Sequence, residues 1–148
     1  MLEAGGARHN VNIASAAGLA PTMNMSAYSA SKHAIMGMSD SLSIELTGTP
    51  VSVSVVCPGI INTPIVHLNA ASVGSNIRPE QVRMLGEYYR KNGAHPSVVG
   101  DAVVHAVCKG RGLVLVGPYA ALIYHLRRFS RKLLNHVLLS DSKKMGWT

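Results

Sequence analysis

The chain has 148 residues, of which 47% are hydrophobic and 14% are charged, and its formal net charge is +7. This composition excludes an intrinsically disordered protein and predicts a single globular domain over residues 1–148. The charge gathers near the C-terminus: residues 109–148 hold eight Lys or Arg against Asp141 alone, whereas six basic and six acidic residues cancel over 1–108. Because the body is neutral, the net charge does not indicate nucleic-acid binding, and we predict no nucleic-acid partner.

Other classes of protein are excluded by patterns that the sequence lacks. No apolar run reaches the roughly 18–20 residues that span a bilayer, and residues 1–10 lack the apolar core of a signal peptide. We expect a cytoplasmic location on these grounds. The seven histidines show no metal-ligand spacing, so no metal site is proposed. The two cysteines, Cys57 and Cys108, are expected to be reduced thiols in the core.

The first predicted elements are a buried strand over 9–15 and a helix from Ala27 to Leu46, with Ser26 as the N-cap of the helix. Two stripes run along this helix, and we expect both to be buried, one on a sheet and the other on a further partner. The first stripe is small (Ala30, Ala34, Gly37 and Ser41) and the second is large and apolar (Ile35, Met38, Leu42 and Leu46).

The later elements complete an alternating pattern. A β-branched run over 51–59 predicts a strand that ends at Pro58-Gly59. Residues 60–97 combine loop and short helix, a helix follows from Ser97 to Cys108, a strand covers 113–117, and a last helix begins at Pro118 and runs to Leu139. The order predicts an α/β domain with three parallel strands joined by right-handed crossovers. The first strand then has an edge that lacks a neighbour.

Tyr28 and Lys32 stand one helical turn apart within the stretch YSASK. A phenol ionises only near about pH 10, and a neighbouring ammonium group favours its ionised form. Ser15, at the end of the first strand, can hold a substrate oxygen beside the phenol. Such a trio can move a proton to or from an alcohol or ketone oxygen. Taken without its surroundings, the pair is better explained as two surface side chains.

Two longer stretches decide between these interpretations. NIASAAGLAPTMNMSAYSASKHAIMGMSDSLSIEL (12–46) strongly resembles the catalytic segment of short-chain dehydrogenases/reductases, with thirteen residues from Ser15 to Tyr28. VCPGIINTPI (56–65) resembles the Pro-Gly loop of the same family, with its downstream threonine. The resemblance implies a Rossmann-like doubly wound sheet, of which this chain carries the C-terminal, catalytic portion without the N-terminal dinucleotide-binding half. It also implies an NAD(P)-dependent oxidoreductase that interconverts an alcohol and a ketone or aldehyde.

The resemblance assigns a role to each matching residue. Tyr28 is the expected general acid/base, Lys32 supports it and binds the nicotinamide ribose, and Ser15 holds the substrate oxygen. The expected residues around the nicotinamide and its phosphates are Pro58, Gly59, Ile61 and Thr63. The cofactor is NAD or NADP, and the residue that chooses between them is not readable. The family commonly pairs subunits through the long helix, here 27–46, so a homo-oligomer is also implied.

The Gly-rich turn that binds a dinucleotide pyrophosphate does not occur in this sequence. Gly5-Gly6 leads into no predicted helix, and Gly110-Arg-Gly112 precedes a strand. A second hypothesis therefore stays open: the chain is a truncated, catalytically inactive fragment that acts at most as a partner-binding or assembly chain.

Two further expectations concern surfaces. Apolar residues of 62–96 lie where the family places its substrate lid, so we expect a small, lipophilic alcohol or carbonyl substrate, although core packing explains the same residues (Ile65, Val66, Leu68, Met84, Leu85, Tyr88 and Tyr89). Residues 118–148 form a basic amphipathic helix and tail. We favour docking of the 118–139 helix on its own domain or a neighbouring subunit over contact with an anionic membrane.

Overall fold

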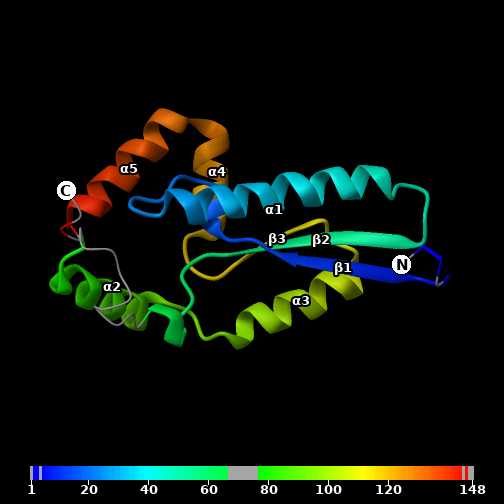
Figure 1. Cartoon of the computed structure of the whole chain (residues 1–148), viewed down its shortest axis with the longest axis horizontal. Helices are drawn as coiled ribbons and strands as arrows, with labels where there is room; N and C mark the ends of the chain where they lie inside the picture. The colour runs from blue at the N-terminus through cyan, green and yellow to red at the C-terminus, as the bar shows by residue number, and fades with distance from the viewer. Residues whose placement is uncertain (1, 4, 67–76, 145, 147–148) are drawn as a thin grey trace.

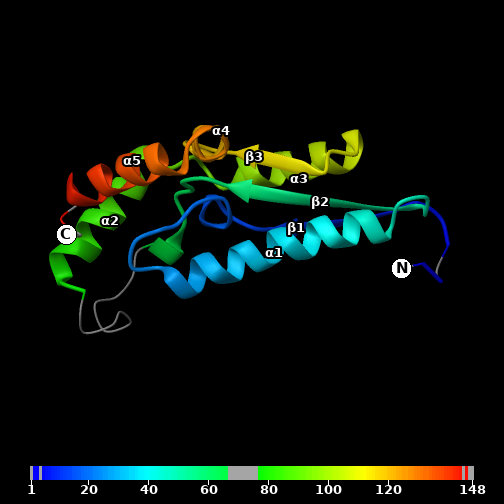
Figure 2. The same ribbon diagram turned by 90° about the horizontal axis from the view of Figure 1, so that it is seen from above.

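The computed structural model describes residues 2–3, 5–66, 77–144 and 146 (Figure 1). Three strands, β1 (Arg8–Ile13), β2 (Val51–Pro58) and β3 (Leu113–Val116), form one parallel sheet in the order β1-β2-β3. Figure 2 shows β2 between its two neighbours. The predicted three-stranded parallel α/β fold is confirmed, and each strand lies within two residues of its predicted bounds.

In the described part of the chain, five helices and two 3₁₀ turns accompany the strands. They are η1 (Ala16–Gly18), α1 (Ser26–Glu45), η2 (Pro64–Val66), α2 (Pro79–Asn92), α3 (Ser97–Lys109), α4 (Ala120–Phe129) and α5 (Arg131–Lys144). Helices α1 and α3 cover opposite faces of the sheet, as Figure 1 shows. None of the helices in the described part of the chain combines the length and the apolar character needed to cross a bilayer.

The central strand is the most deeply buried of the three strands. Val53 to Cys57 of β2 are all buried, whereas no residue of the edge strand β1 is fully buried. β-branched side chains suit this position because they pack well on a pleated surface covered on both sides. Ala14, Leu19, Val55 and Cys57 form a buried cluster, against which side chains of α1, β3 and α4 pack.

The inward face of α1 differs from the predicted large stripe. Met38 is 49% exposed, whereas Ser39 is 2% exposed. Ser39 accepts a hydrogen bond from the Asn12 side chain of β1 at 3.0 Å, and this bond turns a polar residue toward the sheet. The small stripe lies open to solvent, since Ala30, Ala34, Gly37 and Ser41 are all exposed.

Two other predictions about α1 and α3 are wrong. Ser26 is the first residue of α1 and not its cap, and Met25 occupies the N-cap position without a side-chain hydrogen bond. The N–H of Met25 bonds to the Thr22 carbonyl, so a turn leads directly into the helix. Cys57 is buried as predicted, but Cys108 is exposed. Ala106 is the buried residue of α3, and Cys108, two positions later, points to another side of the helix.

The prediction of a single helix from Pro118 to Leu139 is also wrong, because the helix is interrupted at Ser130. Ser130 has an extended backbone, with φ −157° and ψ 116°, and separates α4 from α5. Its hydroxyl accepts a hydrogen bond from the N–H of Leu133 at 3.2 Å. Serine is a favoured residue for such a bond, since its oxygen satisfies an N–H group at the start of a helix.

Candidate active site

The carboxyl ends of the three parallel strands lie at the same end of the sheet, where α1 begins and α2 lies (Figure 1). Ligand sites of open α/β sheets form at the carboxyl ends of the strands, because the loops that follow the strands converge there. The residues predicted from the sequence follow β1, begin α1 or follow β2. The fold therefore brings the three predicted segments to the same end of the molecule.

The turn after β1 is held tightly against α1. The Ser15 hydroxyl accepts a hydrogen bond from the N–H of Ala17 at 3.1 Å and begins η1. At Gly18, an added Cβ would lie 2.7 Å from the carbonyl oxygen of Lys32, so only glycine permits this approach. The buried Ser29 hydroxyl lies 2.7 Å from the carbonyl oxygen of Ala17, to which it donates. These contacts fix the position of Ser15 relative to the first turns of α1.

Tyr28 and Lys32 lie together on the face of α1 next to this turn. The Lys32 ammonium nitrogen is 5.6 Å from the centroid of the Tyr28 ring. It also donates a hydrogen bond to the carbonyl oxygen of Ile13 at 3.1 Å, at the end of β1. Tyr28 remains 41% exposed. The ammonium is thus anchored beside the phenol, and its other N–H groups are available to a ligand.

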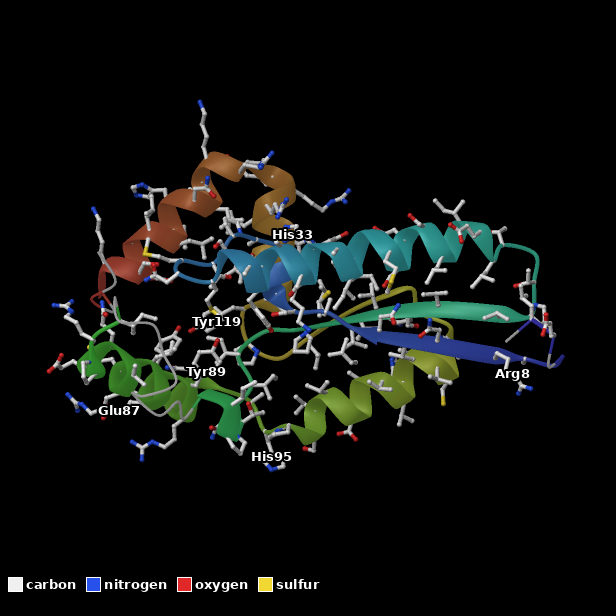
Figure 3. The ribbon with its side chains drawn as sticks, in the orientation of Figure 1. Arg8, His33, Glu87, Tyr89, His95 and Tyr119 are labelled. Carbon is white, nitrogen blue, oxygen red and sulfur yellow. The ribbon has the colours of Figure 1, made fainter. Side chains whose placement is uncertain are left out.

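A group of tyrosines faces the phenol of Tyr28 from the other side. Figure 3 places Tyr89 and Tyr119 between α1 and α2. Burial raises the pKa of Tyr89, and the nearby Tyr28 adds to this effect. Burial, followed by a side-chain hydrogen bond with Tyr119, raises the pKa of Tyr88 to about 12. The phenols of Tyr88 and Tyr89 therefore stay protonated at neutral pH, and together with Tyr119 these tyrosines line the side of the site that lies opposite α1.

The loop after β2 crosses close to the start of α4. Pro58 is the last residue of β2, and the N–H of Gly59 donates to the Val116 carbonyl at 2.8 Å. A Cβ on Gly59 would lie 1.9 Å from the carbonyl oxygen of Pro118, which excludes any other residue there. Ile61 then pairs with Ala94 in a parallel bridge. The backbone of this loop is held on both sides.

The sequence did not indicate every residue that shapes this site. Tyr119 has a left-handed backbone, with φ +67°, and its partner Tyr88 lies 31 positions earlier. The Tyr119 contact thus had no local signal. Among the predicted lid residues, Ile65 is 77% exposed, and Leu68 lies outside the described residues. Thr63 is half-buried just before η2.

Beneath the site lies the buried thiol of Cys57. Burial raises its pKa to about 11, and this effect outweighs a hydrogen bond from the Ser15 backbone, which acts in the opposite direction. The sulfur atom lies 3.3 Å from the sulfur of Met36. Cys57 is therefore an unreactive packing residue at neutral pH and supports the Ser15 turn from below.

The sequence matches known proteins over the same elements. A family model described as short chain dehydrogenase matches residues 1–73, which contain β1, α1 and β2. A Mycobacterium tuberculosis protein named "Probable oxidoreductase EphD" is 32% identical over 131 residues, which make up 86% of this chain and 22% of that protein. The chain belongs to the short-chain dehydrogenase/reductase family.

Solved structures of this family share the fold. A short-chain dehydrogenase/reductase from Burkholderia phymatum, solved with NAD, has a TM-score of 0.73 and 28% identity, and the match covers 90% of this chain and 51% of that one. A variant of actinorhodin polyketide ketoreductase, solved with NADPH, has a TM-score of 0.61 and 28% identity, with coverage of 81% and 49%. The chain thus spans about half the length of these short-chain dehydrogenase/reductase structures and less of the curated relative.

Proposed function

We propose that this chain carries the acid/base centre and the nicotinamide side of an NAD(P)-dependent oxidoreductase that interconverts an alcohol and a ketone or aldehyde. The observation that supports this best is the arrangement of Tyr28 and Lys32. The ammonium lies 5.6 Å from the phenol ring and is tied to the carbonyl end of β1. Ser15 lies in the turn that packs on the same helix.

The donors at this site fit the nicotinamide half of a dinucleotide. Tyr28 and Lys32 offer hydroxyl and ammonium groups to a ribose. Pro58 ends β2, and Gly59, Ile61 and Thr63 follow it in the loop at the same end of the sheet. Both NAD and NADPH occur in the related solved structures. When bound, the cofactor supplies or accepts the hydride. No residue of this chain indicates which of the two cofactors is preferred.

The residues of the chain handle the proton. In the reductive direction, Ser15 donates a hydrogen bond to the carbonyl oxygen of the substrate, and Tyr28 delivers its phenolic proton to that oxygen. The positive charge of Lys32 stabilises the phenolate that forms. In the oxidative direction the phenolate removes the proton from the alcohol. Positioned proton transfer of this kind typically contributes about 10²–10⁴-fold to a rate.

Apolar side chains on α2 support a small, lipophilic substrate. Met84 is 37% exposed, and Leu85, Tyr88 and Tyr89 are half-buried near the carboxyl ends of the strands. Such a lining favours a hydrocarbon chain or ring next to the reacting oxygen.

The open small-residue stripe on α1 supports a homo-oligomer, because closely packed helices need small side chains between them.

Direct titration of cofactor tests the proposal. We expect NADH or NADPH to bind at submillimolar concentration, detected by the change in nicotinamide fluorescence. Lys32→Met should weaken the complex by about tenfold, because it removes a charge-assisted hydrogen bond. Lys91→Met is the matched control, since Lys91 is an exposed lysine at the end of α2. Absence of binding at millimolar concentration of both cofactors, or equal effects of the two variants, would contradict the proposal.

The outer edge of β1 favours the second candidate function. β1 pairs only with β2 in the described part of the chain, so one row of its backbone groups is open to a further strand. A partner chain could pair there, as expected of a partner-binding or assembly chain. This candidate gains support if neither cofactor binds and if an added proline at Val11 reduces self-association measured by sedimentation.

A further inference from the structure

A cavity lies on the opposite side of α1 from Tyr28. It occupies about 320 Å³ between the first turns of α1 and the junction of α4 with α5. Its polar lining consists mainly of Thr22, Ser26, His33, Arg127, Arg131 and Asn135. The function proposed above uses none of these side chains, and we refer to the cavity as the arginine pocket.

The arginine pocket is basic, and the described residues that line it supply no counter-charge, since none of them is an Asp or Glu. Neither Arg127 nor Arg131 forms an ion pair with a residue that the structure describes. Two guanidinium groups that share a cavity repel one another, and an anion between them removes this cost.

Arg127 is already oriented by the protein. One of its terminal nitrogens lies 2.9 Å from His33 Nε2, and the same nitrogen donates to the carbonyl oxygen of Leu19. His33 Nδ1 lies 2.9 Å from the carbonyl oxygen of Ser29. A carbonyl only accepts, so Nδ1 carries the proton and Nε2 accepts from Arg127. Figure 3 shows His33 on the side of α1 that faces α4.

This network leaves the rest of the Arg127 guanidinium for a ligand. Arg131 forms no hydrogen bond with a described residue and adds a second guanidinium. Hydroxyls of Thr22 and Ser26 and the amide of Asn135 complete the polar lining. Arginine forks match the oxygens of a phosphate group in pairs, and hydroxyl and amide donors can bond the remaining oxygens.

We infer that the arginine pocket binds a phosphate group, held chiefly by Arg127 and Arg131. The group belongs either to a small soluble molecule or to the headgroup of an anionic lipid. A lipid headgroup would also have apolar contacts for its acyl chains nearby, because Phe129 is 83% exposed and Leu133 is 43% exposed at the same junction. The site lies apart from Tyr28 and Lys32, so its test does not depend on oxidoreductase activity.

The test is a titration of the whole chain with inorganic phosphate at constant ionic strength, followed by thermal stabilisation and by calorimetry. We expect saturable binding that Arg131→Gln weakens by about tenfold or more. Arg128→Gln is the matched control: Arg128 is exposed, does not line the cavity, and should change the affinity by less than about twofold. Arg131 is the residue of choice because Arg127 also holds α4 against the Leu19 loop.

Vesicles distinguish the two sources of phosphate. If a lipid is the ligand, phosphatidic acid vesicles sediment the chain, phosphatidylcholine vesicles do not, and Phe129→Ser reduces sedimentation without changing the affinity for inorganic phosphate. If a soluble molecule is the ligand, inorganic phosphate binds and vesicles of either composition do not. Equal losses for Arg131→Gln and Arg128→Gln, or no saturable binding in any arm, overturn the inference. Tyr28→Phe should leave phosphate binding unchanged, which separates this site from the proposed catalytic one.

Discussion

The two faces of the first turns of α1 differ in how the protein holds them. On one face, Tyr28 is 41% exposed, and its neighbour Lys32 makes a single hydrogen bond to the backbone of β1. On the other face, Ser29 is 8% exposed and bonds two carbonyl groups, and both ring nitrogens of His33 are engaged. One helix therefore separates Tyr28 and Lys32, which keep bonding positions for a ligand, from Ser29 and His33, whose hydrogen bonds fix the helix in place.

This separation has a physical reason. A group that must exchange protons with a ligand cannot have all its bonding positions occupied by protein, and its own contribution to stability is therefore small. The opposite face compensates, because buried hydroxyl and imidazole groups stabilise the fold only when they are fully bonded. Substitutions on the two faces should consequently affect different measurements.

The largest expected effect is that of Tyr28→Phe. It removes the proposed proton donor and should lower the reduction rate by about 10²–10⁴-fold. The free energy of unfolding should change by less than about 0.5 kcal/mol, because the ring is retained and the residue is substantially exposed. Steady-state rates with a panel of ketones and urea unfolding measure the two quantities, with Tyr124→Phe on α4 as the control. A rate that survives Tyr28→Phe would falsify the proposed acid/base role.

Gly18→Ala should produce the next largest effect. The added methyl would lie 2.7 Å from the carbonyl oxygen of Lys32 and must push η1 away from α1. We expect a loss of about 1–3 kcal/mol of stability in urea unfolding. Gly37→Ala is the matched control, since no atom lies within 4 Å of its added Cβ and a helix-interior alanine stabilises by up to about 1 kcal/mol. Similar effects of both changes would show that η1 is not clamped.

Ser29→Ala tests the face of α1 that lies away from Tyr28. It leaves the carbonyl oxygens of Ala17 and Ala20 without the hydroxyl that lies 2.7 Å and 3.3 Å from them. The expected loss is about 1–2 kcal/mol of stability, measured by the urea midpoint. Ser41→Ala, on the exposed stripe of the same helix, should be nearly neutral. A stable Ser29→Ala variant would remove the distinction between the two faces.

The smallest effect concerns the thiol beneath the site. The pKa of Cys57 is raised from 9.0 to about 11, so the folded state holds its proton more tightly than the unfolded state. The resulting stability is present in full below pH 9 and is lost as the pH rises toward 11. Between about pH 8 and 9.5 the loss should stay under about 1 kcal/mol. Cys57→Ala should flatten this decline, whereas Cys108→Ala should not.

Strand positions and the spacing of the candidate site residues were predictable because they depend on local patterns. Alternating β-branched residues define β2, and the interval from Ser15 through Tyr28 to Lys32 identifies the family without any long-range contact. Three other features were not predictable on this basis. The break at Ser130 comes from one side-chain bond to the Leu133 backbone. The exposure of Cys108 depends on which side of α3 meets the sheet. The bond between His33 and Arg127 joins residues 94 positions apart.

The Ser29 hydroxyl also acts as a staple across the base of a loop. It joins the start of α1 to the carbonyl groups of Ala17 and Ala20, so residues 21–25 form a loop whose two ends are held together. Lengthening such a loop costs little, because closure entropy rises only slowly with the number of residues. The Ser29 hydroxyl thus contributes to the position of the Ser15 turn relative to the start of α1, independently of the length of this loop. We therefore expect a one-residue insertion within 21–25 to leave the Ser15 turn and the start of α1 packed together, although it changes the thirteen-residue interval by which the sequence resembles the family.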